Sequence, residues 1–287
     1  MEGKHNMEME RCREIERSII KRYRKSIWRP FIKGIQEYEL IQEGDKIAVC
    51  ISGGKDSMLL AKLLQELQRH GKMHFELKFL SMNPGYSPKN KEKLLSNAEL
   101  LHIPLHMFDT EIFDIVKNVE ENPCYLCARM RRGHLYKNAQ DLGCNKIALG
   151  HHFDDVIETI LMGMMYGGQI QTMMPKLHST NFSGMELIRP MYLIKEADII
   201  TWKNYNHLEF LQCACRFTEN ISKSGDGVGE SKRQEMKEWI KKMRETSEVI
   251  DRNIFRSVHD VNLDTLIGYH NTKIQYHFLD DYEERRK

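Results

Sequence analysis

Strands and helices alternate through the middle of this chain, and that alternation limits its fold more than any other feature. Short apolar runs rich in β-branched residues are each followed by a segment with apolar residues at helical spacing. We expect strands at 46–51, 74–82, 105–108 and 146–149, and helices at 56–70, 91–101, 129–142 and 153–165. This pattern is typical of βαβ units and predicts an α/β fold with a doubly wound, mostly parallel sheet.

Helical segments are expected on both sides of this core. Residues 8–38 predict a basic amphipathic helix that bends near Pro30, and residues 195–207 and 231–249 predict later helices. We divide the chain into a basic helical segment (1–40), an α/β domain (41–195) and a helical C-terminal region (196–287). Residues 257–287 show no pattern from which we predict structure.

Composition places the chain among ordinary globular proteins. It has 287 residues, 41% of them hydrophobic, and 43 Lys and Arg against 41 Asp and Glu. No apolar run approaches the roughly 18 residues of a membrane helix, and the N-terminus is too charged for a signal peptide. We expect a soluble, cytoplasmic protein that does not associate with membranes.

A phosphate-binding loop is predicted between the first strand and its helix, formed by Ser52, Gly53, Gly54, Lys55, Asp56 and Ser57. The glycines let the backbone approach phosphate oxygens, and the helix N-terminus offers free N–H groups. The serines add hydroxyl donors and Lys55 adds a cation, while a carboxylate at Asp56 suits a bridging Mg²⁺. The Walker A pattern does not fit, because Val49 and Asp56 stand where it requires Gly and Ser or Thr. The alternative is an ordinary Gly-Gly turn.

A second motif, Gly150-His151-His152-Phe153-Asp154-Asp155, follows the strand at 146–149 and opens a helix. It should lie at the same carboxyl edge of the sheet as the phosphate loop, where open α/β folds bind ligands. The two aspartates could simply cap the helix. The neighbouring histidines favour a role in nucleotide binding, metal binding or proton transfer.

The seven cysteines include two close pairs, Cys124 with Cys127 and Cys213 with Cys215. In a reducing compartment such pairs more often bind metal or sulfur than form disulfides. One pair alone would be read as two buried cysteines, but two pairs favour a metal or sulfur site. The remaining three, Cys12, Cys50 and Cys144, are expected to be ordinary thiols.

The hexapeptide 52–57 after its strand resembles the PP-loop of the ATP pyrophosphatases, which adenylate a substrate and release pyrophosphate. With Cys-Tyr-Leu-Cys-Ala-Arg-Met-Arg-Arg at 124–132 and the run 149–177, the chain resembles the tRNA 2-thiocytidine synthetases of the TtcA type. That run holds Gly-His-His-x-Asp-Asp, Tyr-Gly-Gly and Pro-Lys-Leu. The resemblance covers roughly residues 15–250 and implies the adenine nucleotide alpha hydrolase-like fold.

The resemblance implies ATP-dependent thiolation at C2 of an anticodon-loop cytidine, with Lys55 and Asp56 acting on ATP and Mg²⁺. Gly150, His151 and Asp155 would line the nucleotide pocket. Three cysteines would hold a [4Fe–4S] cluster with one open iron: Cys124, Cys127 and Cys213, with Cys215 in reserve. It also implies tRNA and a sulfur donor such as a cysteine desulfurase as partners. The oligomeric state is left open, with a homodimer as one alternative.

Basic side chains are concentrated in residues 11–33, where nine Lys and Arg face only two acidic residues. Contacts with tRNA phosphates are expected from Arg22, Arg24, Lys25, Arg129, Arg131 and Arg132. The alternative is a solvated surface helix whose inward side chains are Ile19, Ile20, Tyr23 and Ile27. A splayed-out base would need a stacking partner, for which Tyr86, Tyr125 and Tyr166 are candidates.

Other functions fit parts of this pattern. A related tRNA thiolase could act on uridine, and a lysidine synthetase would share the loop but needs no cysteine cluster. From a different class, a zinc-stabilised RNA-binding protein with an inactive loop could use all four paired cysteines. Intact Lys55 and Asp56 argue against an inactive loop.

Overall fold

A computed structural model describes residues 2–110, 112, 123–211 and 228–284 of the chain. The chain forms two compact units. The first comprises residues 1–156 and 173–233, and the second comprises residues 157–172 and 234–287. The three-part division at residues 40 and 195 stays a prediction, and the compact units are divided at other positions.

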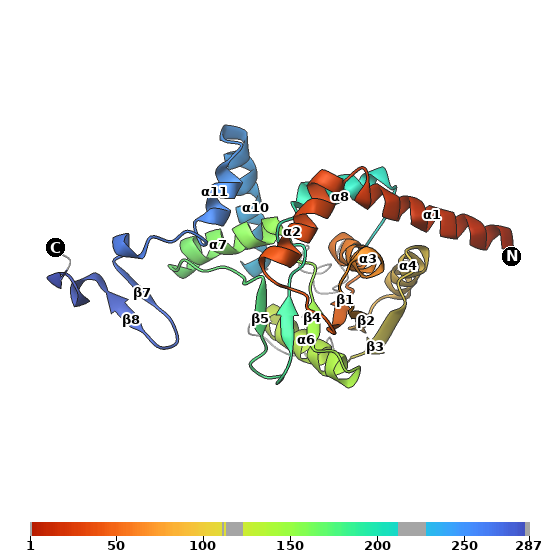
Figure 1. The fold of residues 1–287 in the computed structure, drawn as a ribbon, viewed down its shortest axis with the longest axis horizontal. Coiled ribbons are helices and arrows are strands. Elements are labelled where there is room, and N and C mark those ends of the chain that lie inside the picture. The colour runs from red at the N-terminus through yellow and green to blue at the C-terminus, as the bar shows by residue number, and fades with distance from the viewer. Residues whose placement is uncertain (1, 111, 113–122, 212–227, 285–287) are drawn as a thin grey trace. The chain divides into compact units, whose positions relative to one another are not determined.

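A six-stranded sheet forms the centre of the first unit, in the order β3-β2-β1-β4-β6-β5 (Figure 1). Its strands are β1 (Lys46–Cys50), β2 (Glu76–Asn83), β3 (Leu105–Asp109), β4 (Lys146–Ala148), β5 (Lys176–His178) and β6 (Glu186–Ile188). All neighbours pair in parallel except β5 and β6. The predicted mostly parallel sheet is confirmed, and the two three-residue strands β5 and β6 are additions to the prediction.

The connecting helices are those that the periodicity predicts: α3 (Lys55–His70), α4 (Pro88–Leu100), α6 (Pro123–Asp141), α7 (Phe153–Gly167) and α8 (Glu196–Tyr205). One boundary differs in a way that concerns the site. The sequence places Cys124 and Cys127 before a helix beginning at Arg129, whereas α6 begins at Pro123 and includes both. Proline is favoured in the first turn of a helix, because no hydrogen bond to its missing N–H is required there.

Helices cover both faces of the sheet, as a doubly wound fold requires. Successive side chains of β1 point to opposite faces. Ile47 and Val49 lie in a core cluster with residues of α3 and α8, whereas Ala48 and Cys50 lie in a second cluster with residues of α6. Figure 1 shows α3 and α4 on one side of the strands and α6 on the other.

The N-terminal segment is helical but is interrupted earlier than predicted. Helix α1 (Glu2–Ile20) is followed by a π-helical turn, η1 (Arg24–Trp28), and then by α2 (Arg29–Glu37). Pro30 lies in the first turn of α2 and does not cause the bend. Ile19, Tyr23 and Ile27 are buried as predicted, so this segment belongs to the main core.

The second unit includes most of α10 (Val228–Thr246), together with α11 (Ile250–Arg256) and a hairpin of β7 (Gly268–His270) and β8 (Gln275–His277). The hairpin lies where the sequence shows no clear pattern. In the described part of the chain, no helix has both the length and the apolar character needed to span a membrane.

Candidate active site

The phosphate loop leaves β1 and enters α3 through a hydrogen-bonded turn. The Ser52 N–H donates to Ser57 Oγ at 3.2 Å, and the Ser57 hydroxyl donates to the Gly54 carbonyl at 2.9 Å. Gly53 has φ +85°, a conformation that strains residues with a side chain. Among the described residues, no side chain of the N-cap residue Gly54 caps α3. The first N–H groups of a helix have no acceptor within the helix, so those of α3 can donate to a ligand at the end of β1.

The second motif lies directly against this loop. A methyl group built on Gly150 would lie 3.2 Å from the backbone carbonyl carbon of Asp56 and from the Ser57 backbone nitrogen. Only glycine permits so close an approach without displacing one backbone. The sequence expectation that the two motifs meet at one sheet edge is confirmed.

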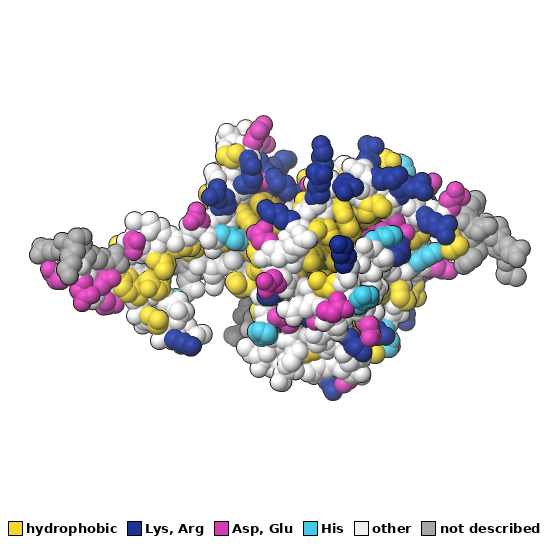
Figure 2. Space-filling model, viewed as in Figure 1, with side chains coloured by type: hydrophobic (Ala, Val, Ile, Leu, Met, Phe, Trp, Pro, Cys, Tyr) yellow, Lys and Arg dark blue, Asp and Glu magenta, His cyan; other side chains and the backbone are white. Residues whose placement is uncertain are grey.

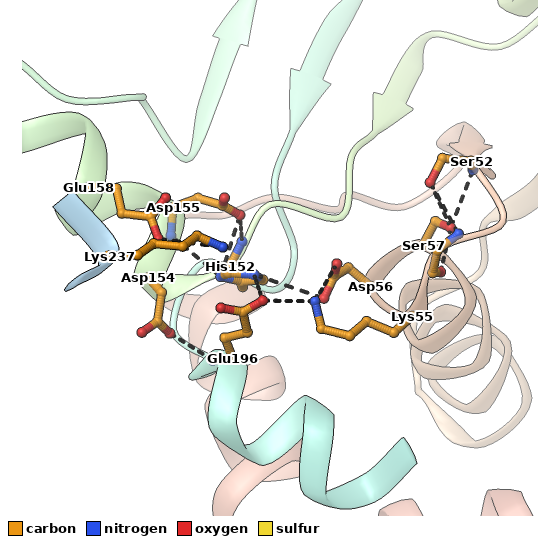
Figure 3. Close-up of polar contacts among 11 residues, drawn as sticks. Ser52, Lys55, Asp56, Ser57, His152, Asp154, Asp155, Glu158, Glu196 and Lys237 are labelled. Atoms are coloured by element: carbon orange, nitrogen blue, oxygen red, sulfur yellow. Dashed lines mark hydrogen bonds and ion pairs between the residues drawn. The ribbon is translucent and has the colours of Figure 1, made fainter. Parts of the chain in front are cut away.

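Lys55 extends from the loop toward the second motif and the start of α8 (Figure 3). Its Nζ lies 2.8 Å from Glu196 Oε1 and 3.1 Å from Asp56 Oδ2. Burial alone would lower the pKa of Lys55, but the Asp56 and Glu196 carboxylates raise it above its ordinary value. The ammonium is therefore charged at neutral pH.

A cavity of about 440 Å³ opens beside the loop. Among the residues that line it are these members of the phosphate loop and the second motif: Ser52, Asp56, Ser57, Gly150, His151 and Asp155. Arg131 and Arg132 reach the same cavity from α6, the helix that carries Cys124 and Cys127. Its volume is in the range of sites that bind small molecules and cofactors.

Two buried polar atoms at this cavity have no hydrogen-bond partner among the described residues: Asp56 Oδ1 and His151 Nδ1. Burial, and then the positive charge of Arg189, lowers the pKa of His151 to about 4. The imidazole is therefore neutral at pH 7 and can accept or donate one hydrogen bond. A carboxylate oxygen left free beside a phosphate loop suits Mg²⁺, which prefers oxygen ligands.

Three matches with known proteins identify the family of this chain. Residues 22–219 match the PP-loop domain. A tRNA-cytidine(32) 2-sulfurtransferase of Geobacter metallireducens is 32% identical over 84% of this chain and 91% of its own length. The same-named enzyme of Paracidovorax citrulli is 34% identical over 83% of this chain and 71% of its own length. The chain belongs to the PP-loop family of the tRNA-cytidine(32) 2-sulfurtransferases.

A solved structure supports the fold of this PP-loop chain. The U34-tRNA thiolase NcsA from Methanococcus maripaludis, solved with its [4Fe–4S] cluster, superposes with a TM-score of 0.62. The superposition covers 83% of this chain and 80% of the thiolase at 20% sequence identity. At that identity the likeness concerns the fold.

The side chains of the cysteines predicted to bind the iron–sulfur cluster lie outside the described part of the chain. The backbones of Cys124 and Cys127 lie three residues apart in the first turns of α6, and their side chains are not described. Cys213 and Cys215 lie in 212–227, also outside it. The other three cysteines, Cys12, Cys50 and Cys144, are buried free thiols, as expected.

The predicted RNA contacts separate into two groups. Arg131 and Arg132 line the cavity, whereas Arg129 does not. Arg22, Arg24 and Lys25 are exposed on and beside η1, where Figure 2 shows Lys and Arg side chains gathered over the N-terminal helices. Tyr86 lines the cavity and is buried, and Tyr166 is exposed.

Glu196 and Arg189 belong to the site without being predicted from the sequence, and His152 was predicted only as part of the second motif. Glu196 pairs with Lys55 across 141 residues of chain. Arg189 is buried and adds positive charge beside His151. His152 is buried with Nε2 3.9 Å from both Asp56 Oδ1 and Glu196 Oε1. The histidine pair in the second motif drew attention to His152, but no local pattern marks Glu196 or Arg189.

Proposed function

We propose that this chain is an ATP-dependent tRNA sulfurtransferase that converts a cytidine at position 32 of the anticodon loop to 2-thiocytidine. The observation that carries the proposal is that one cavity is lined by the phosphate loop, by the second motif and by two arginines of the cysteine-bearing helix. Such a cavity lets a phosphate-activating loop and a sulfur-delivering group act on one base.

The chemistry requires activation before sulfur transfer, because the C2 oxygen of cytosine is a poor leaving group. That oxygen attacks the α-phosphorus of ATP, and pyrophosphate leaves. A sulfur nucleophile then attacks C2, and the oxygen leaves with AMP. Both steps occur at one carbon–oxygen unit, so the nucleotide and the base must be bound side by side.

The phosphate loop stabilises charge on the phosphates in this scheme. Lys55 and the N–H groups at the start of α3 would bind phosphate oxygens, with Ser52 and Ser57 as hydroxyl donors. Asp56, whose Oδ1 has no hydrogen-bond partner in the described part of the chain, would hold Mg²⁺. The neutral His151 and the Asp155 carboxylate would orient the nucleotide or the base in the cavity.

The sulfur is proposed to come through the cysteines. Cys124, Cys127 and Cys213, with Cys215 in reserve, form a donor set of thiolates suited to a [4Fe–4S] cluster. When bound, such a cluster supplies an iron that is not ligated by protein and can carry sulfide. A donor such as a cysteine desulfurase would supply the sulfur atom.

The tRNA is proposed to bind through two sets of cations. Arg22, Arg24 and Lys25 are exposed on and beside η1 and would contact backbone phosphates. Arg131 and Arg132, with Arg129, would guide the anticodon loop toward the cavity. Base stacking is assigned to Tyr86, because it lines this cavity, whereas the side chain of Tyr125 lies outside the described part of the chain.

The decisive experiment compares tRNA nucleosides by mass spectrometry between a strain lacking the gene and its parent. We expect loss of 2-thiocytidine, restored by the wild-type gene and by Cys144→Ala, but not by Cys124→Ala. Cys144 is a matched control because it is a buried free thiol that belongs to neither pair. If a thiouridine or lysidine is lost instead, the enzyme modifies a different nucleoside from the one proposed. If all tRNA nucleosides are unchanged, the proposal of tRNA modification is refuted.

Metal analysis tests the cluster separately. Anaerobically purified protein is expected to be brown and to contain iron and acid-labile sulfide. Zinc without colour would instead support the RNA-binding protein with four sulfur ligands.

A further inference from the structure

The ion pair between Lys55 and Glu196 has no role in the proposed reaction, in which Lys55 binds phosphate. Lys55 Nζ lies 2.8 Å from Glu196 Oε1 and 3.1 Å from Asp56 Oδ2. The Lys55 and Glu196 side chains are only 23% and 24% exposed. Two carboxylates therefore neutralise the phosphate-binding cation before any nucleotide arrives.

Glu196 is held in this position by the second motif. It is the first residue of α8, and its backbone N–H donates to Asp154 Oδ2 at 2.6 Å. A second hydrogen bond joins the same two segments, because the Phe153 N–H donates to the Ile194 carbonyl at 2.9 Å. Figure 3 shows the Glu196 side chain directed toward Lys55.

His152 lies next to the two carboxylates that pair with Lys55. Its side chain is 4% exposed, and its Nε2 lies 3.9 Å from Asp56 Oδ1 and 3.9 Å from Glu196 Oε1. The Lys55 ammonium and the Asp56 and Glu196 carboxylates together carry one net negative charge. A triphosphate approaching this group is repelled unless a cation enters with it, and partial burial strengthens the repulsion.

We propose that Glu196 is a positioning residue that holds Lys55 and makes nucleotide binding depend on a divalent cation. The inference rests on the proposed use of ATP. Asp56 Oδ1 is buried without a hydrogen-bond partner among the described residues, and it is the ligand atom through which Mg²⁺ would enter. The charge of Mg²⁺ then offsets the carboxylates, and Lys55 turns from Glu196 to the phosphates.

The test measures ATP affinity of the full chain by calorimetry at fixed ionic strength, once with Mg²⁺ and once with EDTA. Glu196→Gln removes one negative charge, so the ratio of the EDTA to the Mg²⁺ dissociation constant should fall by about tenfold. Glu196→Asp keeps the charge and should restore the wild-type ratio. Glu43→Gln is the control, since Glu43 precedes β1 at the opposite sheet edge and pairs with exposed His74.

Each outcome decides the inference. An unchanged ratio in Glu196→Gln overturns it, as does an equal loss of affinity in both conditions, which would indicate a structural role. If Glu196→Gln does not fold, Asp154→Asn loosens Glu196 through its backbone and should lower the same ratio less. An unchanged ratio there also overturns the inference. Failure of the wild type to bind Mg²⁺ and ATP at all would instead refute the proposed function.

Discussion

Lys62 offers the sharpest test of how the N-terminal helix is tied to the phosphate-loop helix. Its side chain in α3 is completely buried. The ammonium donates to Glu16 of α1 at 2.6 Å, to Gln65 at 2.8 Å and to the Leu101 carbonyl at 2.9 Å. We predict that Lys62→Met, which fills the same volume without the charge, destabilises the first unit.

The magnitude follows from what the substitution leaves behind. Breaking a buried ion pair costs about 3–5 kcal/mol, because the remaining charge is uncompensated. Glu16 keeps a contact with Arg69 at 3.1 Å, so we expect the lower end, about 3 kcal/mol. With a urea slope of about 2–3 kcal/mol/M, the unfolding midpoint should fall by about 1–1.5 M.

Equilibrium urea unfolding followed by tryptophan fluorescence measures this loss, since Trp202 is fully buried in the same unit. Lys33→Met is the matched control, because Lys33 is 70% exposed and should change stability by less than about 0.5 kcal/mol. A double-mutant cycle with Glu16→Gln should give a coupling energy of at least about 1 kcal/mol. Coupling near zero, or a loss under about 1 kcal/mol, would refute the ion-pair reasoning.

The pH dependence gives a second check on the same pair. Burial alone would raise the pKa of Glu16, but Lys62 and then Arg69 lower it below its ordinary value. A carboxyl group whose pKa is lower in the folded than in the unfolded state stabilises the folded protein at pH values above the unfolded-state pKa. This contribution is lost as the pH falls through the folded-state pKa. The stability difference between wild type and Lys62→Met should therefore be largest near neutral pH and shrink in acid.

Three further predictions concern the site and the proposed RNA contacts. Gly150→Ala should weaken ATP binding by at least about tenfold in calorimetry, because its methyl group would displace the Asp56 backbone; unchanged affinity would contradict the close approach. Arg22 is exposed and its guanidinium lies over the Tyr205 ring. Arg22→Ala should reduce the magnitude of the slope of log binding constant for tRNA against log salt concentration by about one, and an unchanged slope would exclude a phosphate contact. His151→Phe should remove part of the stability lost between pH 6.5 and 4, since a neutral buried imidazole resists protonation; thermal unfolding at several pH values measures it, and an identical pH profile would argue against the lowered pKa.

Local sequence determined most of the architecture of the first unit. Apolar runs and helical periodicity are short-range signals, so β1 to β4 and the helices after them lie close to their predicted positions, except for the start of α6 at Pro123. The phosphate loop and Gly150–Asp155 follow strands directly, and parallel pairing brings the ends of β1 and β4 to one edge. Their meeting was therefore predictable.

The tertiary structure decided what depends on distant partners. Strands β5 and β6 have three residues each and acquire their hydrogen bonds from the existing sheet, which no local pattern encodes. The bend near residue 22 depends on the π-helical turn, whereas Pro30 is tolerated in a first helical turn.

The same distinction holds within the site. The residue types in the phosphate loop already indicated binding of phosphate and Mg²⁺, because two glycines, Lys55 and Asp56 lie together in one short segment. That Lys55 faces Glu196, 141 residues away, is decided only when α8 is anchored to Asp154. Charge pairing depends on distance in space, which the order of residues along the chain does not specify.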